Sequence, residues 1–341
     1  MSRINSHQPP FPYFGGKSSV AEKVWAIIGD VANYVEPFCG SCAVLLLRPG
    51  GAGHVETVND ADGLLANFWR AMQRDSDAVA DAADNPVNEC DLHARHLWLL
   101  GQKLRITERL MGDPDFYDAK AAGWWAWGQC CWIGSGWCSG KGPWVSEGGE
   151  FVLRNTGKGV NRKLPHLSAG KGVNRKRPHL GGTGKGECAE RSAWLRSYLR
   201  GFADRLRNVR VACGDWSRVC GPSVTIKHGI TGVFLDPPYA DTATRTKGLY
   251  ANDCDQVAHV VREWAIEQGS NPMMRIVLAG YQDEHQMPSD WRVEEWEAVG
   301  GYGLISDDEE STGRANKGRE RLWCSPHCLK QDDEYQLFGA A

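Results

Sequence analysis

Residues 232–239 read GVFLDPPY, a short apolar run followed at once by Asp236, two prolines and Tyr239. Such a run is typical of a buried strand. Two consecutive prolines cannot continue the hydrogen-bond ladder of a sheet, so the strand must stop there in an extended turn. The sequence therefore predicts that the Asp236 carboxylate, a proline carbonyl and the Tyr239 ring are presented together at the edge of a sheet. An isolated Asp-Pro-Pro-Tyr also occurs as a plain strand-ending turn.

The rest of the chain indicates the kind of sheet. Strand-like runs alternate with amphipathic helical patterns along both ends of the chain, an order typical of an α/β fold with a doubly wound, mostly parallel sheet. Such a sheet binds its ligands beyond the carboxyl ends of its strands. The predicted strands are 33–36, 54–59, 209–212, 232–235 and 275–279, and the predicted helices are 61–74, 191–206 and 257–264.

Residues 81–190 lack this alternation and are expected to form an insert between a first part of the parent domain, 1–80, and a second part, 191–341. The insert contains a tryptophan-rich segment. Tryptophan usually fills a core, so we expect most of these rings to be buried and one or two to face a ligand. The six tryptophans are Trp124, Trp125, Trp127, Trp132, Trp137 and Trp144.

A basic repeat ends the insert. GKGVNRKLPHL at 157–167 returns as GKGVNRKRPHL at 170–180. Residues 154–191 contain ten Lys and Arg against two acids, a local charge of +8 in a chain whose net charge is −3. The repeat is either a solvated linker or an arm that binds nucleic acid, and the tryptophans beside it favour the arm.

Composition excludes several classes of protein. The chain has 341 residues, of which 42% are hydrophobic and 24% charged, so it is neither disordered nor fibrous. No apolar run approaches the ~18 residues of a membrane helix, and the first residues lack an apolar signal region. We therefore expect an intracellular protein, with no membrane partner, whose twelve cysteines are reduced.

Two further patterns point away from other chemistries. Gly16-Lys17-Ser18 is not a phosphate loop, because Phe11 stands where that loop has its first glycine. Cys39 and Cys42 have the spacing of a redox motif but follow a strand in a glycine turn, so thiol exchange is not expected. The other cysteine groups lack the paired spacing of a structural zinc site and predict buried thiols and no metal: Cys130, Cys131 and Cys138, and Cys324 and Cys328 beside His327.

Taken together, these motifs make the chain resemble the DNA adenine-N6 methyltransferases of the Dam type, many of which are carried by phages. The similarity covers roughly 10–73 and 208–325. PYFGGK, which ends at Lys17, resembles the family's N-terminal cofactor motif, YVEPFCGSC at 34–42 its glycine-rich turn, and Asp-Pro-Pro-Tyr its catalytic motif. The resemblance implies a Rossmann-like methyltransferase sheet with an inserted DNA-recognition domain, S-adenosylmethionine as cofactor, double-stranded DNA as partner, and the cytoplasm of a bacterial or phage-infected cell as location.

The resemblance also implies roles for the matching residues. Asp60 ends the second strand about twenty residues after Gly40, where a doubly wound site places an acid on the ribose hydroxyls. Cys42 stands where the family commonly has a second glycine, which narrows the backbone freedom of that turn. The expected cofactor-binding residues are Tyr13, Gly16, Lys17, Glu36, Pro37, Phe38, Gly40, Asp60, Asp215 and Trp216, and the expected catalytic residues are Asp236, Pro237, Pro238 and Tyr239.

The implied chemistry follows from the electronics of adenine, whose amino nitrogen is a poor nucleophile because its lone pair is delocalised into the ring. If Asp236 accepts one amino hydrogen and the Pro237 carbonyl another, the nitrogen becomes more tetrahedral and carries positive charge more easily during attack. Tyr239 would stack on the adenine, which must leave the duplex because its amino group is otherwise paired. No metal is required.

DNA binding falls to the insert, whose lysines and arginines would contact phosphates and base edges. Two alternatives remain. A methyltransferase for RNA or for glutamine in protein shares the sheet and the Pro-Pro-Tyr turn, although family members acting on glutamine begin the motif with Asn rather than Asp236. A non-catalytic DNA-binding module is the other, and the sequence indicates no oligomeric state. The expected DNA contacts are Arg162, Lys163, Arg175, Lys176 and Arg177.

Overall fold

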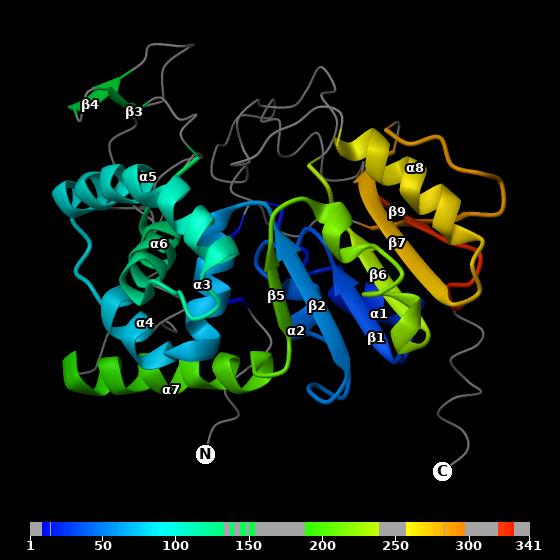
Figure 1. Ribbon diagram of the computed structural model, residues 1–341, viewed down its shortest axis with the longest axis horizontal. Helices are drawn as coiled ribbons and strands as arrows, with labels where there is room; N and C mark the ends of the chain where they lie inside the picture. The colour runs from blue at the N-terminus through cyan, green and yellow to red at the C-terminus, as the bar shows by residue number, and fades with distance from the viewer. Residues whose placement is uncertain are drawn as a thin grey trace, which may run out of the picture.

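The computed structural model shows a seven-stranded sheet with helices on both faces (Figure 1). It describes residues 9–13, 15–132, 137–139, 144–147, 150–153, 188–238, 257–282, 284–296 and 320–330. In chain order the elements are α1 (Ala21–Ile28), β1 (Asn33–Glu36), α2 (Ala43–Leu46), β2 (Val55–Asp60), α3 (Gly63–Arg74), α4 (Ser76–Ala83), α5 (Glu89–Gly112), α6 (Ala119–Cys131), β3 (Trp144–Glu147), β4 (Glu150–Leu153), α7 (Cys188–Leu206), β5 (Arg210–Cys213), the 3-10 helices η1 (Trp216–Val219) and η2 (Ile226–His228), β6 (Thr231–Leu235), α8 (Val257–Gly269), β7 (Met274–Tyr281), β8 (Arg292–Glu295) and β9 (Glu320–Cys324).

The strand order of the large sheet is β5-β2-β1-β6-β7-β9-β8. The first five strands are parallel, and β9 runs antiparallel to both β7 and β8. From β1 the chain moves outward to β2 and β5, then crosses back to β6 and β7 on the other side of β1. The carboxyl ends of β1 and β6 therefore form a topological switch point, where sheets of this kind bind ligands. The predicted doubly wound, mostly parallel fold is confirmed.

The two faces of the sheet are covered differently. Alternate side chains of β6 point to opposite cores: Phe234 joins a core with α1, α2 and α3, whereas Val233 and Leu235 join one with α8 and η1. Neighbouring residues of a strand face opposite sides of a sheet, so a strand covered on both faces is apolar throughout. This double burial explains the unbroken apolar run that precedes Asp236.

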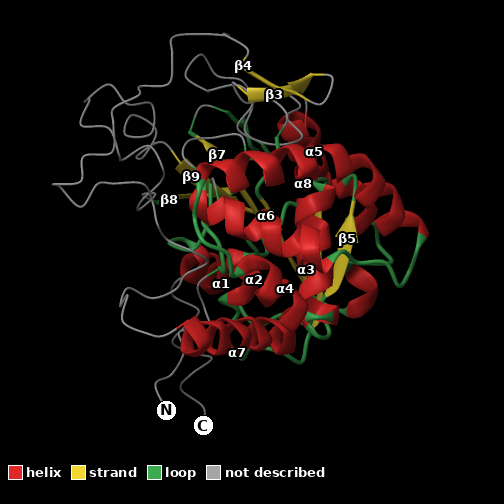
Figure 2. Cartoon of the chain, turned by 90° about the vertical axis from the view of Figure 1, so that its left-hand side faces the viewer, coloured by secondary structure: helices red, strands yellow, loops and turns green. Residues whose placement is uncertain are grey.

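The predicted insert contains α5 and α6, and α4 crosses its predicted first boundary at residue 81. These three helices pack against α3 and α7 at the β5 end of the sheet (Figure 2). Trp125, Trp127 and Trp137 are buried in the core that these helices share with one face of the sheet, and Trp124 and Trp132 are partly buried against it. Most of the described tryptophans of the segment thus fill the core, as predicted. The basic repeat lies outside the described residues, so the proposed recognition role of the insert stays a prediction.

Most of the described cysteines are buried, as predicted. Nine of the ten that the structure describes are buried, Cys90 is exposed, and none of the ten forms a disulfide. In the described part of the chain, no helix combines the length and the apolar character needed to cross a membrane.

Gly63, the first residue of α3, lets α5 approach closely. A Cβ on Gly63 would lie 1.9 Å from Thr107 Oγ1 and 3.1 Å from Thr107 Cα, so any larger residue forces the two helices apart. We predict that Gly63→Ala lowers the free energy of unfolding by about 1–3 kcal/mol.

Gly101 supplies the matched control, because it lies on the exposed side of α5, where an added Cβ would have no other atom within 4 Å. Gly101→Ala should raise the free energy of unfolding by up to about 1 kcal/mol, since alanine favours the helix. Urea unfolding of both variants checks the pair. Equal stability of the two variants would contradict the close packing at Gly63.

Candidate active site

A cavity of about 350 Å³ opens at the carboxyl ends of β5, β2, β1 and β6, at the switch point of the sheet. This volume lies within the range of about 300–1,000 Å³ typical of small-molecule sites. Pro237 does not line the cavity, and Tyr239 and the five basic residues expected to bind DNA lie outside the described residues. The predicted site residues that the structure brings together here are Tyr13, Gly16, Lys17, Glu36, Pro37, Phe38, Gly40, Asp60, Asp215, Trp216, Asp236 and Pro238.

The segment before α1 forms one wall of the pocket. The Gly16 N–H donates to the Tyr13 carbonyl (3.1 Å), which closes a tight turn. Opposite it, Gly40 has a φ of 45°, and a Cβ there would meet the Tyr13 ring at 2.7 Å. Gly40 is required both for its backbone conformation and for the close approach of Tyr13.

Glu36, the last residue of β1, is a buried carboxyl at the floor of the pocket. Its Oε2 accepts hydrogen bonds from the Tyr34 hydroxyl (3.0 Å) and the Leu45 N–H (3.2 Å). Burial raises the pKa of Glu36 to about 8, and the hydrogen bonds from Tyr34 and Leu45 only partly oppose this. Glu36 is therefore largely protonated at neutral pH while the pocket contains protein groups alone.

The turn after β1 requires an unusual backbone conformation at Cys42. It has a φ of 53°, in the left-handed region that favours glycine, and its N–H donates to the Cys39 carbonyl (2.6 Å). Cys39 lines the pocket, whereas Cys42 lies beneath it and does not. Cys42 thus adopts a backbone conformation that glycine favours, and its side chain is buried in the core.

The end of β2 positions two acids. Asp60 accepts the N–H of Gly40 (3.1 Å) and the N–H of Asp62 (2.9 Å), which links it to the β1 turn and to the start of α3. Burial raises the pKa of Asp60 to about 6, helped by the charge of Asp62 and opposed by these hydrogen bonds and by Lys103. Asn59 donates to the carbonyls of Pro37 and Gly214 (3.0 Å each) and so ties three strand ends together.

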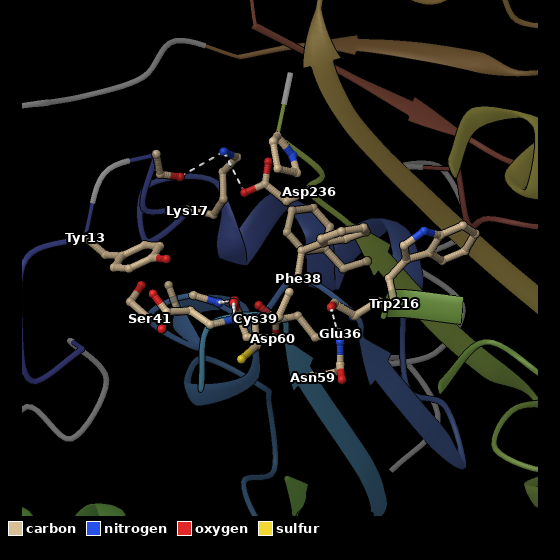
Figure 3. Close-up of a pocket in the computed structure, with 18 of the residues that line it drawn as sticks. Tyr13, Lys17, Glu36, Phe38, Cys39, Ser41, Asn59, Asp60, Trp216 and Asp236 are labelled. Carbon is tan, nitrogen blue, oxygen red and sulfur yellow. Dashed lines mark hydrogen bonds and ion pairs between the residues drawn. The ribbon is translucent and has the colours of Figure 1, made fainter. Parts of the chain in front are cut away.

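An aromatic wall follows β5. Trp216 lies nearly parallel to Phe38, with ring centroids 6.3 Å apart and an angle of 28°, and Trp264 of α8 packs edge-on behind it at 5.9 Å. The Asp215 carboxylate accepts the Ser217 N–H (2.9 Å), which starts η1 and fixes Trp216 beside the pocket. Figure 3 shows Phe38 and Trp216 on one side of the pocket and Tyr13 on the other.

Lys17 and Asp236 form an ion pair at the rim. Lys17 Nζ lies 2.9 Å from Asp236 Oδ2 and donates to the Gly15 carbonyl (2.8 Å) (Figure 3). Lys17 is only 5% exposed and Asp236 18%. Burial lowers the pKa of Lys17, but the carboxylates of Asp236 and Glu320 outweigh burial and raise it above its ordinary value. Lys17 therefore keeps its charge at neutral pH, and the ion pair fixes the direction of the Asp236 carboxylate.

The charge of the lining indicates the ligand. Among the described residues that line the cavity, five are carboxylic acids and Lys17 is the one basic residue. An excess of acids around an aromatic wall suits a cationic ligand with a flat ring system. The five acids are Glu36, Asp60, Asp62, Asp215 and Asp236.

The fold and the pocket at its switch point are consistent with a Rossmann-like methyltransferase. Residues 13–96 match the family model of the D12 class N6 adenine-specific DNA methyltransferase, so this domain is found in the chain, in agreement with the resemblance to enzymes of the Dam type. The match supports DNA adenine-N6 methylation as the activity. A comparison with curated proteins gives no match.

Sequence reasoning missed three polar residues of the pocket: Ser41, Asn59 and Asp62. Asn59 and Asp62 flank Asp60, and the rule that ligands gather beyond strand ends could have pointed to them. Ser41 gave no such signal, because a small polar residue in a glycine turn is common.

The raised pKa of Glu36 predicts a pH dependence of stability. The folded protein keeps the proton up to about pH 8, whereas an unfolded chain releases it near 4.5, so the contribution to stability present at low pH is lost as pH rises through this range. From pH 6 to pH 9, the wild type should lose about 2–3 kcal/mol of unfolding free energy relative to Glu36→Gln. Urea unfolding at both pH values measures this, and a constant difference between the two proteins contradicts it.

Proposed function

We propose that this chain is an S-adenosylmethionine-dependent methyltransferase that acts on N6 of adenine in double-stranded DNA. The observation that carries the proposal is that Asp236, held by Lys17, lines the same pocket as Asp60 and Trp216. A candidate catalytic carboxylate and candidate ribose and adenine contacts thus belong to one cavity. The matched family supports the reaction, and the chemistry of the lining supports the cofactor.

The donor set fits S-adenosylmethionine. The acids that line the pocket outnumber its one described basic residue, which suits the sulfonium and ammonium charges of the cofactor. Asp60 is placed to accept the two ribose hydroxyls, and Phe38 and Trp216 offer an apolar wall for its adenine ring. When bound, the cofactor supplies a methyl group on a positively charged sulfur.

Asp236 is the proposed acceptor for the amino group of the target adenine. An ionised carboxylate that accepts an N–H stabilises the positive charge that develops on the nitrogen during attack. Lys17 fixes that carboxylate before substrate arrives, so little reorganisation is needed in the transition state. The Pro237 carbonyl and the Tyr239 ring are the proposed second acceptor and stacking partner, for a base turned out of the duplex.

DNA itself is proposed to bind through the insert, with the basic repeat on the phosphates. The location proposed with it, as the resemblance implies, is the cytoplasm of a bacterial or phage-infected cell. The two alternatives make different demands: an RNA or protein methyltransferase requires a different acceptor, and a non-catalytic module requires no cofactor. Tritium transfer from labelled S-adenosylmethionine to DNA, RNA and protein separates all three.

Removal of the proposed acceptor tests the mechanism. Asp236→Ala should lower methyl transfer to DNA by at least about a hundredfold, because one fixed transition-state contact is typically worth that much. Cofactor affinity, measured by calorimetry, should stay within a few fold because Asp60 and Trp216 remain. Asp290→Ala, in an exposed turn before β8, is the control and should be fully active. Substantial activity of Asp236→Ala would contradict the proposed mechanism.

The basic repeat has its own test. Replacing Arg162, Lys163, Arg175, Lys176 and Arg177 together by alanine should raise the dissociation constant for DNA and flatten its salt dependence, with each lost phosphate contact reducing the logarithmic slope by about 0.9. The control is the double variant Arg207→Ala with Lys227→Ala, which removes two exposed basic side chains near the amino ends of β5 and β6. An unchanged slope in the five-fold variant would return the repeat to the role of a linker.

A further inference from the structure

A lysine on one helix of the insert contacts an acid that lines the pocket. Lys103, in the middle of α5, places Nζ 3.2 Å from Asp62 Oδ2 and 3.5 Å from the Cys138 carbonyl. Its helix cannot drift from this position, because Thr107, one turn later, packs against Gly63 and its hydroxyl donates to the Lys103 carbonyl (2.8 Å). Lys103 is therefore held at the boundary between insert and pocket.

Asp62 connects this lysine to the proposed ribose acid. One Asp62 oxygen accepts the Leu64 N–H (2.9 Å) and caps α3, and the other faces Lys103. The Asp62 N–H in turn donates to Asp60 (2.9 Å). Asp60 and Asp62 are thus two carboxylates on one short turn, both lining the pocket, and the charge of Asp62 disfavours the ionised form of Asp60.

Three thiols also lie near Asp60. Burial raises the pKa of Cys39, of Cys42 and of Cys213 above the ordinary value. Arg218, beyond β5, acts on Cys213. Lys103 is thus a basic group that directly balances Asp62 on the Asp60 side of the pocket. Glu36 has its own set of neighbours, which includes Asp236 and Glu56.

We propose that Lys103 is a positioning residue of the cofactor pocket: by neutralising Asp62, it keeps Asp60 ionised and able to accept both ribose hydroxyls of S-adenosylmethionine. The proposal rests on the function proposed above. It assigns the insert a part in cofactor binding as well as in DNA binding. The same lysine also contacts the turn at 137–139, which precedes β3 and the basic repeat in the chain.

The physical consequence is a shift of the pH at which cofactor binds. Burial already raises the pKa of Asp60 to about 6, and Lys103 opposes that rise. Without the lysine, Asp62 is left unbalanced and raises the pKa of Asp60 further. As the pH is lowered, Asp60 of the variant should then become protonated, and cofactor affinity should fall, at a higher pH than in the wild type.

The test is the dissociation constant of S-adenosylmethionine measured by calorimetry from pH 5 to pH 9, for the wild type and four variants. Lys103→Met should move the lower midpoint of the affinity profile up by about one pH unit, with the largest loss of affinity between pH 6 and 7 and convergence with the wild type at high pH. Lys103→Arg keeps the charge and should restore the wild-type midpoint. Asp62→Asn keeps the helix cap and should lower the midpoint. The double variant Lys103→Met with Asp62→Asn should return the midpoint from the raised value of Lys103→Met to near the wild-type value.

A purely structural role for Lys103 would give a different pattern: a uniform loss of affinity at every pH, with the midpoint unchanged. An unchanged midpoint in Lys103→Met overturns the inference, whether or not affinity falls, and so does a double variant that fails to recover. Melting temperatures show whether each variant is folded, and Asp62→Asn tests the same balance from the other side. A wild type that binds no cofactor at any pH overturns the proposed function itself, and the inference with it.

Discussion

The ion pair between Lys17 and Asp236 is the contact that fixes the proposed catalytic carboxylate at the rim of the pocket. It joins the segment before α1 to the end of β6, two parts of the chain that are distant in sequence. Taking two charges out of water costs several kcal/mol per ion, and their attraction offsets this only in a good geometry. The pair therefore adds little to stability and fixes arrangement instead. With Lys17 in place, the turn at 13–16 lies over the β1 turn, and Tyr13 rests on Gly40.

The described lining of the pocket comes from the segment before α1, from the sheet with its connections, and from the first residue of α8. The sheet supplies the ends of four parallel strands, and α5 of the predicted insert contacts this lining from outside, where Lys103 pairs with Asp62. Buried acids are costly unless paired, hydrogen-bonded or protonated, and three solutions occur here. Asp236 is paired with Lys17, Asp60 accepts two backbone N–H groups, and Glu36 keeps its proton. A cationic ligand would stabilise the acids of the pocket in a fourth way, because its positive charge would balance theirs.

Much of the fold was predictable because its signals are local. The doubly buried run before Asp236, the helical face of 61–74 and the acid that ends β2 each follow from periodicity and strand-end rules. The helices α4, α5 and α6 were not predicted, since they are stabilised by packing against α3 and α7 rather than by a clear apolar face of their own. The same limit applies to the site. Strand ends pointed to Asp60 and Asp236, but Lys17 meeting Asp236, and Lys103 meeting Asp62, join positions that only the folded chain brings together.

The most direct measurement of the central claim is nucleoside analysis of DNA from a methylation-free host that expresses the chain. An account in which Asp236 grips the adenine amino group predicts N6-methyldeoxyadenosine at a defined sequence, and none in DNA from cells expressing Asp236→Asn. A cytosine modification in its place, or DNA without any methylated base while the folded protein accumulates, would contradict it.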